Sequence, residues 1–151
     1  MMEITKANLF DLNALRALEQ VCFPLDAWPL LDLISVLTIP GVIRLKVVED
    51  GQMIGFAAAD PHPIENISWI ATICINPAQQ GRGFGRALMN AIEAHLNTPI
   101  VKLCVRPNND VAIRMYKSMG YEPIDTWRHY YNDGSDSLVM QKLLFEPKVE
   151  L

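Results

Sequence analysis

Apolar residues recur at helical spacing in four stretches of this chain. The stretch 84–96 is the clearest, because its apolar positions fall three and four residues apart along one stripe. Weaker stripes cover 12–22 and 30–37. A fourth helix is predicted between Asn109, a good N-cap residue, and Gly120, which suits the position after a helix end. The chain is therefore expected to contain four amphipathic helices.

Runs of β-branched and other apolar residues lie between and after these helices. They predict strands over 42–49, 53–59, 67–75, 100–105, 121–131 and 136–145. The run 60–63, Asp-Pro-His-Pro, is predicted to be a loop because proline interrupts regular structure. Strands and helices alternate through the middle, and a hairpin ends the chain. This order predicts one α/β domain over 1–151, built on a single mixed sheet.

Composition narrows the class of protein. The chain has 151 residues, of which half are hydrophobic and 20% are charged, with a net charge of −4. These values are typical of a globular domain and argue against nucleic-acid binding. No apolar run approaches the length of a membrane span, and the first residues do not resemble a secretion signal. Neither monomer nor homodimer is excluded.

The three cysteines carry a further prediction. Cys22, Cys74 and Cys104 have neither the spacing of a metal site nor that of a disulfide framework. Free cysteines are typical of a reducing compartment. We therefore expect a cytoplasmic protein without a bound metal.

The most informative stretch is the glycine-rich run Gln80-Gly81-Arg82-Gly83-Phe84-Gly85-Arg86. It lies where the strand 67–75 gives way to the helix 84–96. Glycines leave backbone N–H groups uncovered, and a helix N-terminus adds the positive end of its dipole. The two arginines supply charge. The run therefore predicts a site for a phosphate or diphosphate.

Two common phosphate-binding motifs do not fit this run. A dinucleotide fingerprint, G-x-G-x-x-G, requires glycine where Arg86 stands, and a Walker loop requires a Gly-Lys-Ser/Thr triplet that the chain lacks. A glycine-rich turn that only links strand to helix is the alternative interpretation, and the flanking Gln80 and Arg86 and the amphipathic helix that follows argue against it.

Together with Ile73-Cys74-Ile75-Asn76-Pro77, the glycine-rich run resembles the acetyl-CoA motif Q/R-x-x-G-x-G/A of the GNAT acetyltransferases. The resemblance implies a three-layer fold, with helices on both faces of a mixed, mostly antiparallel sheet. It implies that Ile73, Cys74 and Ile75 pair through their backbone with the pantetheine arm. Residues 80–86 would hold the diphosphate of acetyl-CoA.

Two later blocks extend the resemblance. Val105-Arg106-Pro107-Asn108-Asn109, followed by the helix that contains Tyr116, resembles the second family block. It implies that Asn109 contacts the cofactor and that Tyr116 protonates the leaving thiolate as general acid. The block 130–140, which begins Tyr130-Tyr131, resembles the protein N-terminal α-amine acetyltransferases, above all the ribosomal-protein alanine group. Both tyrosines are candidates for binding the acceptor amine.

The chain departs from that group at one position. The resemblance places a glutamate general base where this chain has Cys104. A thiol has a pKa of about 8.5, raised further by burial, so Cys104 is a poor substitute. A small core residue is the alternative interpretation. Asp26, Glu65 and His129 are other candidate bases or acceptor contacts, although a solvated loop or edge position is the favoured interpretation of each.

The acceptor decides how much a weak base matters. An α-amine, with a pKa of about 7.7–8.0, is roughly 10–20% neutral at pH 7. A lysine ε-amine, with a pKa of about 10.4, is only about 0.04% neutral. The resemblance implies an N-terminal α-amine of a protein or peptide as the acceptor, and this difference in pKa supports it. Small-molecule amines such as polyamines, amino acids or aminoglycosides, and a non-catalytic acetyl-CoA-binding module, remain alternatives.

Overall fold

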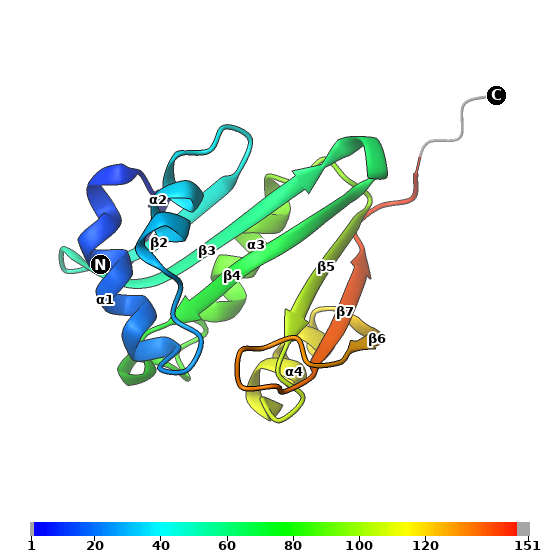
Figure 1. The fold of residues 1–151 in the computed structure, drawn as a ribbon. Coiled ribbons are helices and arrows are strands. Elements are labelled where there is room, and N and C mark those ends of the chain that lie inside the picture. Colours follow the sequence, from blue (N-terminus) through cyan, green and yellow to red (C-terminus); the bar gives the residue numbers. More distant parts are fainter. Residues whose placement is uncertain (1, 148–151) are drawn as a thin grey trace. The chain divides into compact units, whose positions relative to one another are not determined.

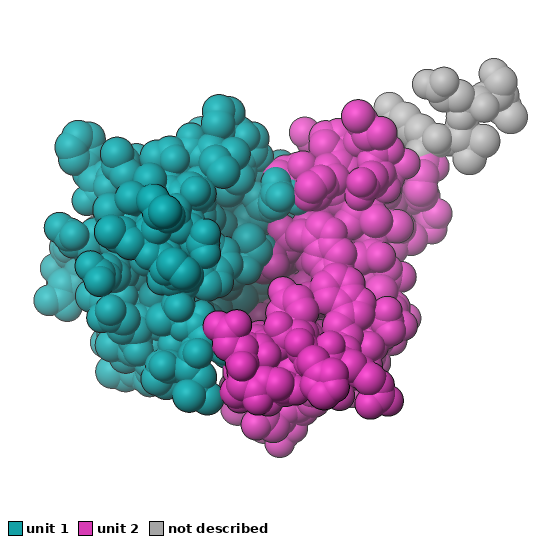
Figure 2. Space-filling view, viewed as in Figure 1, with its two compact units in different colours: residues 1–60, 71–96 teal, residues 61–70, 97–151 magenta. Residues whose placement is uncertain are grey.

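The computed structural model describes residues 2–147. The strands follow the order β1-β2-β3-β4-β5-β7-β6 in one seven-stranded sheet, drawn in Figure 1. β4 runs parallel to β5, whereas the β1–β2, β2–β3, β5–β7 and β6–β7 pairs are antiparallel. The chain divides into two compact units, coloured separately in Figure 2. Unit 1 comprises residues 1–60 and 71–96, and unit 2 comprises residues 61–70 and 97–151.

Unit 1 contains three α-helices and the first strands of the sheet. The helices are α1 (Leu12–Cys22), α2 (Leu30–Thr38) and α3 (Phe84–Ala94). The strands are β1 (Met2–Lys6), β2 (Ile43–Glu49), most of β3 (Gln52–His62) and the second half of β4 (Ile67–Ile75).

The helices of unit 1 pack on both faces of its strands. Leu15 of α1 and Leu33 of α2 belong to one buried cluster with Phe56 of β3. Phe56 pairs with Lys46 across the β2–β3 ladder, so α1 and α2 cover that face. α3 packs against β2 and buries Leu88 among its apolar positions. Each predicted helix stripe is thus used to bury an apolar face.

Unit 2 contains one α-helix and the remaining strands. These are α4 (Asp110–Ser118), the first half of β4, β5 (Ile100–Val105), β6 (Glu122–Trp127) and β7 (Ser137–Leu143). In β5 the side chains alternate between fully buried and half-buried, as expected of a strand with two different faces. β7 pairs with β5 from Ile100↔Leu143 to Val105↔Leu138.

The predicted helices and the strands β4 and β5 are confirmed, whereas three other predictions are wrong. β1 was not predicted, because its five residues are mostly exposed and its apolar alternation is limited to Met2 and Ile4. The run 60–63 is not entirely loop, since β3 continues through His62. The φ of Pro61 suits an extended strand, and its missing N–H is tolerated near a strand end.

The third wrong prediction concerns the hairpin that ends the chain. β6 ends at Trp127 instead of extending to residue 131. His129 has a φ of 55°, a left-handed conformation that stops the strand. Tyr130 and Tyr131 therefore lie in the loop between β6 and β7, called the β6–β7 loop below.

Candidate active site

The glycine-rich run forms the turn that starts α3. Gly81 and Gly83 adopt φ values of 85° and 83°, in the left-handed region that favours glycine. Gly83 is the N-cap of α3, and its carbonyl accepts the first helical hydrogen bond, from Ala87 N at 3.1 Å. A glycine N-cap offers no side chain to the first amides of the helix. The run thus has the local geometry of an anion site.

The Arg82 side chain is held by its own unit. Its Nη1 and Nη2 donate to the two carboxylate oxygens of Glu49, each at 2.9 Å, and Nη1 also donates to Gln79 Oε1 at 2.6 Å. The guanidinium lies 4.6 Å from the ring centre of Phe84. The ion pair lowers the pKa of the Glu49 carboxyl. Arg82 therefore fixes the loop to the end of β2, and its contact with a cofactor stays a prediction.

The end of β4 lies beside the C-terminus of α1. The Cys22 thiol donates to the Ile75 carbonyl at 3.3 Å, and a hydrogen bond joins the Cys22 and Cys74 side chains. That bond lowers the pKa of Cys22, whereas the pKa of Cys74 is well raised, first by the same bond and then by burial. Gln80 Nε2 donates to the Ile75 carbonyl at 3.4 Å. The strand segment 73–75 and the glycine-rich run are thus tied together.

A buried carboxyl group lies in the same unit. Glu19 of α1 is 1% exposed. Its Oε2 accepts from the Trp28 backbone N–H at 3.2 Å, whereas Oε1 has no hydrogen-bond partner. Burial raises the pKa of Glu19 and the Trp28 bond offsets part of that rise. This group fastens the α1–α2 loop to α1.

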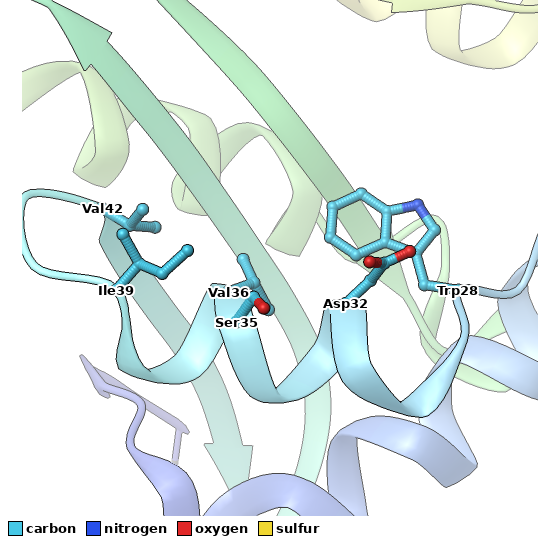
Figure 3. A pocket seen from close by; sticks show the side chains of 6 residues that line it. All are labelled: Trp28, Asp32, Ser35, Val36, Ile39 and Val42. Carbon is cyan, nitrogen blue, oxygen red and sulfur yellow. The ribbon is translucent and has the colours of Figure 1, made fainter.

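A groove of about 260 Å³ follows one side of α2, as Figure 3 shows. Its lining consists of Trp28, Asp32, Ser35, Val36, Ile39 and Val42. None of the residues predicted to bind the cofactor or the acceptor belongs to this lining. The groove and the predicted site therefore share no residues.

α4 carries the predicted acid. Asn109 is its N-cap, and the Asn109 Oδ1 accepts from Ala112 N at 3.2 Å. The capping role is thus confirmed, while a cofactor contact stays a prediction. Tyr116 is only 5% exposed, and its ring centre lies 5.8 Å from that of Tyr121. Burial raises the pKa of Tyr116 far above its usual value, so the phenol stays protonated at neutral pH.

Cys104, at the predicted base position, belongs to a small polar cluster. Its thiol is half-buried on β5 and hydrogen-bonds with the side chains of Ser137 and Tyr130. Burial raises the pKa of Cys104 more than these hydrogen bonds lower it. Burial and Cys104 together raise the pKa of Tyr130 to about 12. Both groups are therefore protonated at neutral pH, and neither is a strong base there.

The ring of Tyr131 packs against Arg106, which directly follows β5 and forms an ion pair with Asp133. The Arg106 guanidinium lies 4.2 Å from the Tyr131 ring centre, and Arg106 Nη1 donates to Asp133 Oδ2 at 3.1 Å. Ser135 backbone and side-chain hydrogen bonds, and then Arg106, lower the pKa of Asp133. Tyr131 N also donates to the Ser135 carbonyl at 3.1 Å. These bonds give the β6–β7 loop a defined conformation.

The other candidate bases lie in loops. Asp26 is partly exposed in the α1–α2 loop of unit 1, and its N–H donates to the Phe23 carbonyl at 3.2 Å. Glu65 is exposed in a short 3₁₀ helix of unit 2. His129 turns back on its own loop, where Nδ1 lies 3.2 Å from the Gly134 carbonyl oxygen. Their roles stay predictions.

Sequence reasoning assigned no role to two residues that shape these clusters. Glu49, which holds Arg82, lies 33 residues before it in the sequence, and Ser137 lies 33 residues after Cys104. Charge and polarity are visible in the sequence, but pairing over such separations depends on the fold. In the sequence, Glu49 is only the last residue of the predicted strand 42–49.

Within residues 2–147, no cluster of His, Cys, Asp and Glu could hold a metal ion. No helix in the same range is long and apolar enough to cross a bilayer.

Comparison with known proteins identifies the family. Residues 12–121, more than half of the chain, match the profile of the acetyltransferase (GNAT) family. The chain belongs to this family. N-alpha-acetyltransferase RimI of Mycobacterium tuberculosis is 30% identical over 124 residues, which cover 78% of this chain and 76% of RimI. The catalytic subunit NAA10 of the Arabidopsis thaliana N-terminal acetyltransferase A complex is 26% identical, over 95% of this chain and 79% of NAA10.

A solved structure supports the same assignment. The ribosomal-protein-S18-alanine N-acetyltransferase of Escherichia coli superposes with a TM-score of 0.89 and 25% identity, over 100% of this chain and 99% of that one. The predicted family, the GNAT fold and the enzyme class are thus confirmed, with acetyl-CoA as co-substrate.

Proposed function

We propose that this GNAT enzyme transfers the acetyl group of acetyl-CoA to the α-amine of a protein or peptide N-terminus. Its two compact units would act as one acetyltransferase domain. The names of its relatives support the acceptor class, since RimI and NAA10 are both named for N-terminal or N-alpha acetylation. The three free cysteines favour a cytoplasmic enzyme.

One observation carries the donor half of this proposal. Gly81 and Gly83 are both left-handed, directly before the amides that open α3. A diphosphate bound there would accept hydrogen bonds from main-chain N–H groups and lie at the positive end of the helix dipole. The backbone of β4 over residues 73–75 would hold the pantetheine arm in an extended conformation.

The chemical step needs a group that donates a proton to the leaving thiolate more than it needs a strong base. When the amine attacks the thioester carbonyl, the C–S bond breaks and the coenzyme leaves as a thiolate. Tyr116, protonated because burial raises its pKa, would donate a hydrogen bond or the proton to that sulfur. The amine loses its own proton to solvent or to a side chain after attack.

The missing glutamate fits this acceptor class. With a raised pKa, the Cys104 thiol cannot accept a proton efficiently at neutral pH. An α-amine needs little help, because roughly 10–20% of it is already neutral at pH 7. Deprotonating a lysine ε-ammonium at pH 7 costs about 4.6 kcal/mol. The chemistry of the site therefore favours α-amines over lysine side chains.

The test is thiol release from acetyl-CoA with three matched acceptors. These are a peptide with a free N-terminus and no lysine, the same peptide with a blocked N-terminus and one lysine, and spermidine. Turnover is expected with the first peptide, and mass spectrometry should find the acetyl group on its α-amine. Turnover only with spermidine would replace the proposal by a small-amine acetyltransferase. Binding of acetyl-CoA without turnover would indicate a non-catalytic module.

A further inference from the structure

Unit 2 has one sheet face that its own α-helix does not cover. The ring of Tyr121, which contacts Tyr116 of α4, also lies 5.6 Å from the Lys142 Nζ. Lys142 pairs with Val101, so α4 lies on the face of β5 that buries Val101. Cys104 points to the opposite face. Among the described residues of unit 2, α4 is the sole α-helix, so this opposite face carries none from that unit.

A row of four aromatic rings lies along this opposite face. Trp69 and Trp127 have ring centres 5.4 Å apart, Trp127 and Tyr130 lie 5.7 Å apart, and Tyr130 and Tyr131 lie 4.9 Å apart. Trp69 belongs to β4 and Trp127 to β6, with β5 and β7 between them in the sheet. The two indoles therefore reach toward each other across two strands.

The middle of this row is open to solvent. Trp127 is 37% exposed and Tyr130 is 49% exposed. The indole N–H of Trp127 donates to Asp125 Oδ2 at 3.2 Å, which satisfies its polar atom and fixes its orientation. What remains toward solvent is the apolar ring surface. Exposed aromatic rings held in fixed orientations are typical of recognition surfaces.

The row is continuous with the proposed acceptor site. Tyr130 hydrogen-bonds with Cys104, the position where the family resemblance places the base, and Tyr131 is the next ring. An acceptor amine reacting near Cys104 would place the following residues of its peptide along the same sheet face. This step rests on the proposed function.

We propose that Trp69 and Trp127 recognise a large apolar or aromatic side chain in the acceptor peptide, among the residues directly after the acetylated one. The two indoles would offer such a side chain apolar surface and, for an aromatic side chain, edge-to-face or stacked ring contacts. A cationic side chain is disfavoured, because the Lys102 ammonium already lies 5.8 Å from the Trp69 ring centre. Lys102 instead favours an acidic residue next to the apolar one.

The test compares matched hexapeptides with a free N-terminus. The peptides differ in a single residue, Phe or Ser, placed in turn at the second, third or fourth position. At one of these positions the wild type is expected to prefer Phe by about tenfold in kcat/KM. Trp127→Ala and Trp69→Ala should abolish this preference by lowering kcat/KM for the Phe peptide alone. The KM for acetyl-CoA should stay unchanged.

Matched variants separate recognition from folding. Phe10 of unit 1 is 99% exposed, so Phe10→Ala removes an aromatic ring elsewhere and should keep the preference. If Trp127→Ala unfolds, Trp127→Thr places a strong strand former at the same edge position. In a Trp28→Phe background the two remaining tryptophans of the chain are Trp69 and Trp127, so the Phe peptide should change the intrinsic fluorescence.

The outcomes separate this inference from the proposed function. Turnover of Phe and Ser peptides at equal rates, or an equal loss for both in the Trp127 variants, would overturn the indole site while leaving N-terminal acetylation intact. Absence of turnover with every peptide, together with an unchanged fluorescence in the Trp28→Phe protein, would overturn both.

Discussion

The glycine-rich run of unit 1 and the aromatic row of unit 2 differ in the chemical groups they offer. Around Gly81 and Gly83 the available groups are main-chain amides, and the Arg82 guanidinium is already bound by Glu49. In unit 2 the available groups are side chains, among them the half-buried thiol of Cys104 and the exposed ring of Tyr130. Donor binding should therefore depend on backbone conformation, and acceptor chemistry on individual functional groups.

This difference predicts that related enzymes vary less at the diphosphate site than at the acceptor site. A diphosphate is the same in every acetyl-CoA molecule, and left-handed glycines that hold it have few replacements. Acceptors vary between enzymes, and side chains can be exchanged without changing the fold. Cys104 illustrates the second case, since a group that stays protonated at neutral pH stands where the family resemblance predicts a base.

The largest expected effect is at the glycine-rich run. Gly83→Val should weaken acetyl-CoA binding about 100-fold. A left-handed conformation costs an L-residue roughly 1–2 kcal/mol, and more for a β-branched one, so the loop must change shape. Titration calorimetry with acetyl-CoA measures the effect.

Gly41→Val is the matched control for this substitution. Gly41 has a φ of 88° and, like Gly83, nothing within 4 Å of an added Cβ. The same backbone strain should destabilise this variant while acetyl-CoA affinity stays within about twofold. Equal losses of affinity in both variants would indicate general destabilisation and contradict the diphosphate site.

The next effect is expected at Tyr116. Tyr116→Phe should lower kcat about 100-fold and leave the KM for acetyl-CoA unchanged, because general acids typically contribute 10²–10⁴-fold. Steady-state kinetics at saturating peptide measure it. Tyr121→Phe is the control, since Tyr121 is equally buried and adjacent. An unchanged kcat in Tyr116→Phe would reduce Tyr116 to a packing role.

The smallest effect is expected at Cys104. Cys104→Ala should change kcat by less than about threefold at pH 7, because a thiol with a raised pKa accepts few protons there. In both proteins kcat/KM should rise with pH through the pKa of the acceptor α-amine, about 7.7–8.0. A pH profile of each protein tests this. A 100-fold loss in Cys104→Ala would instead show that the thiolate takes part.

Local signals in the sequence predicted the helices well. The stripe of α3 and the glycine that follows the C-cap of α4, Gly120 with a φ of 99°, depend on neighbouring residues alone. β1 was not predicted, because it is a short edge strand whose residues are mostly exposed. The end of β6 was not predicted, because a positive φ such as that of His129 is unusual for a non-glycine residue.

The backbone conformation of the glycine-rich run follows from its motif, whereas contacts between distant side chains cannot be predicted from local sequence. Left-handed glycines before a helix can be recognised in the sequence by the spacing of the glycines. The contact of Trp69 with Trp127 joins residues 58 positions apart through two intervening strands. Only the register of the sheet brings such residues together, and that register depends on all of its strands.

One measurement tests the central claim, that main-chain amides at the start of α3 bind the diphosphate of the coenzyme. Calorimetry compares acetyl-CoA with S-acetylpantetheine, which lacks the diphosphate, on the wild type and on Gly83→Val. The wild type should bind acetyl-CoA at least 100-fold more tightly, and Gly83→Val should lose most of that difference. Equal affinity of the wild type for both thioesters, or a difference that survives in Gly83→Val, would contradict the account.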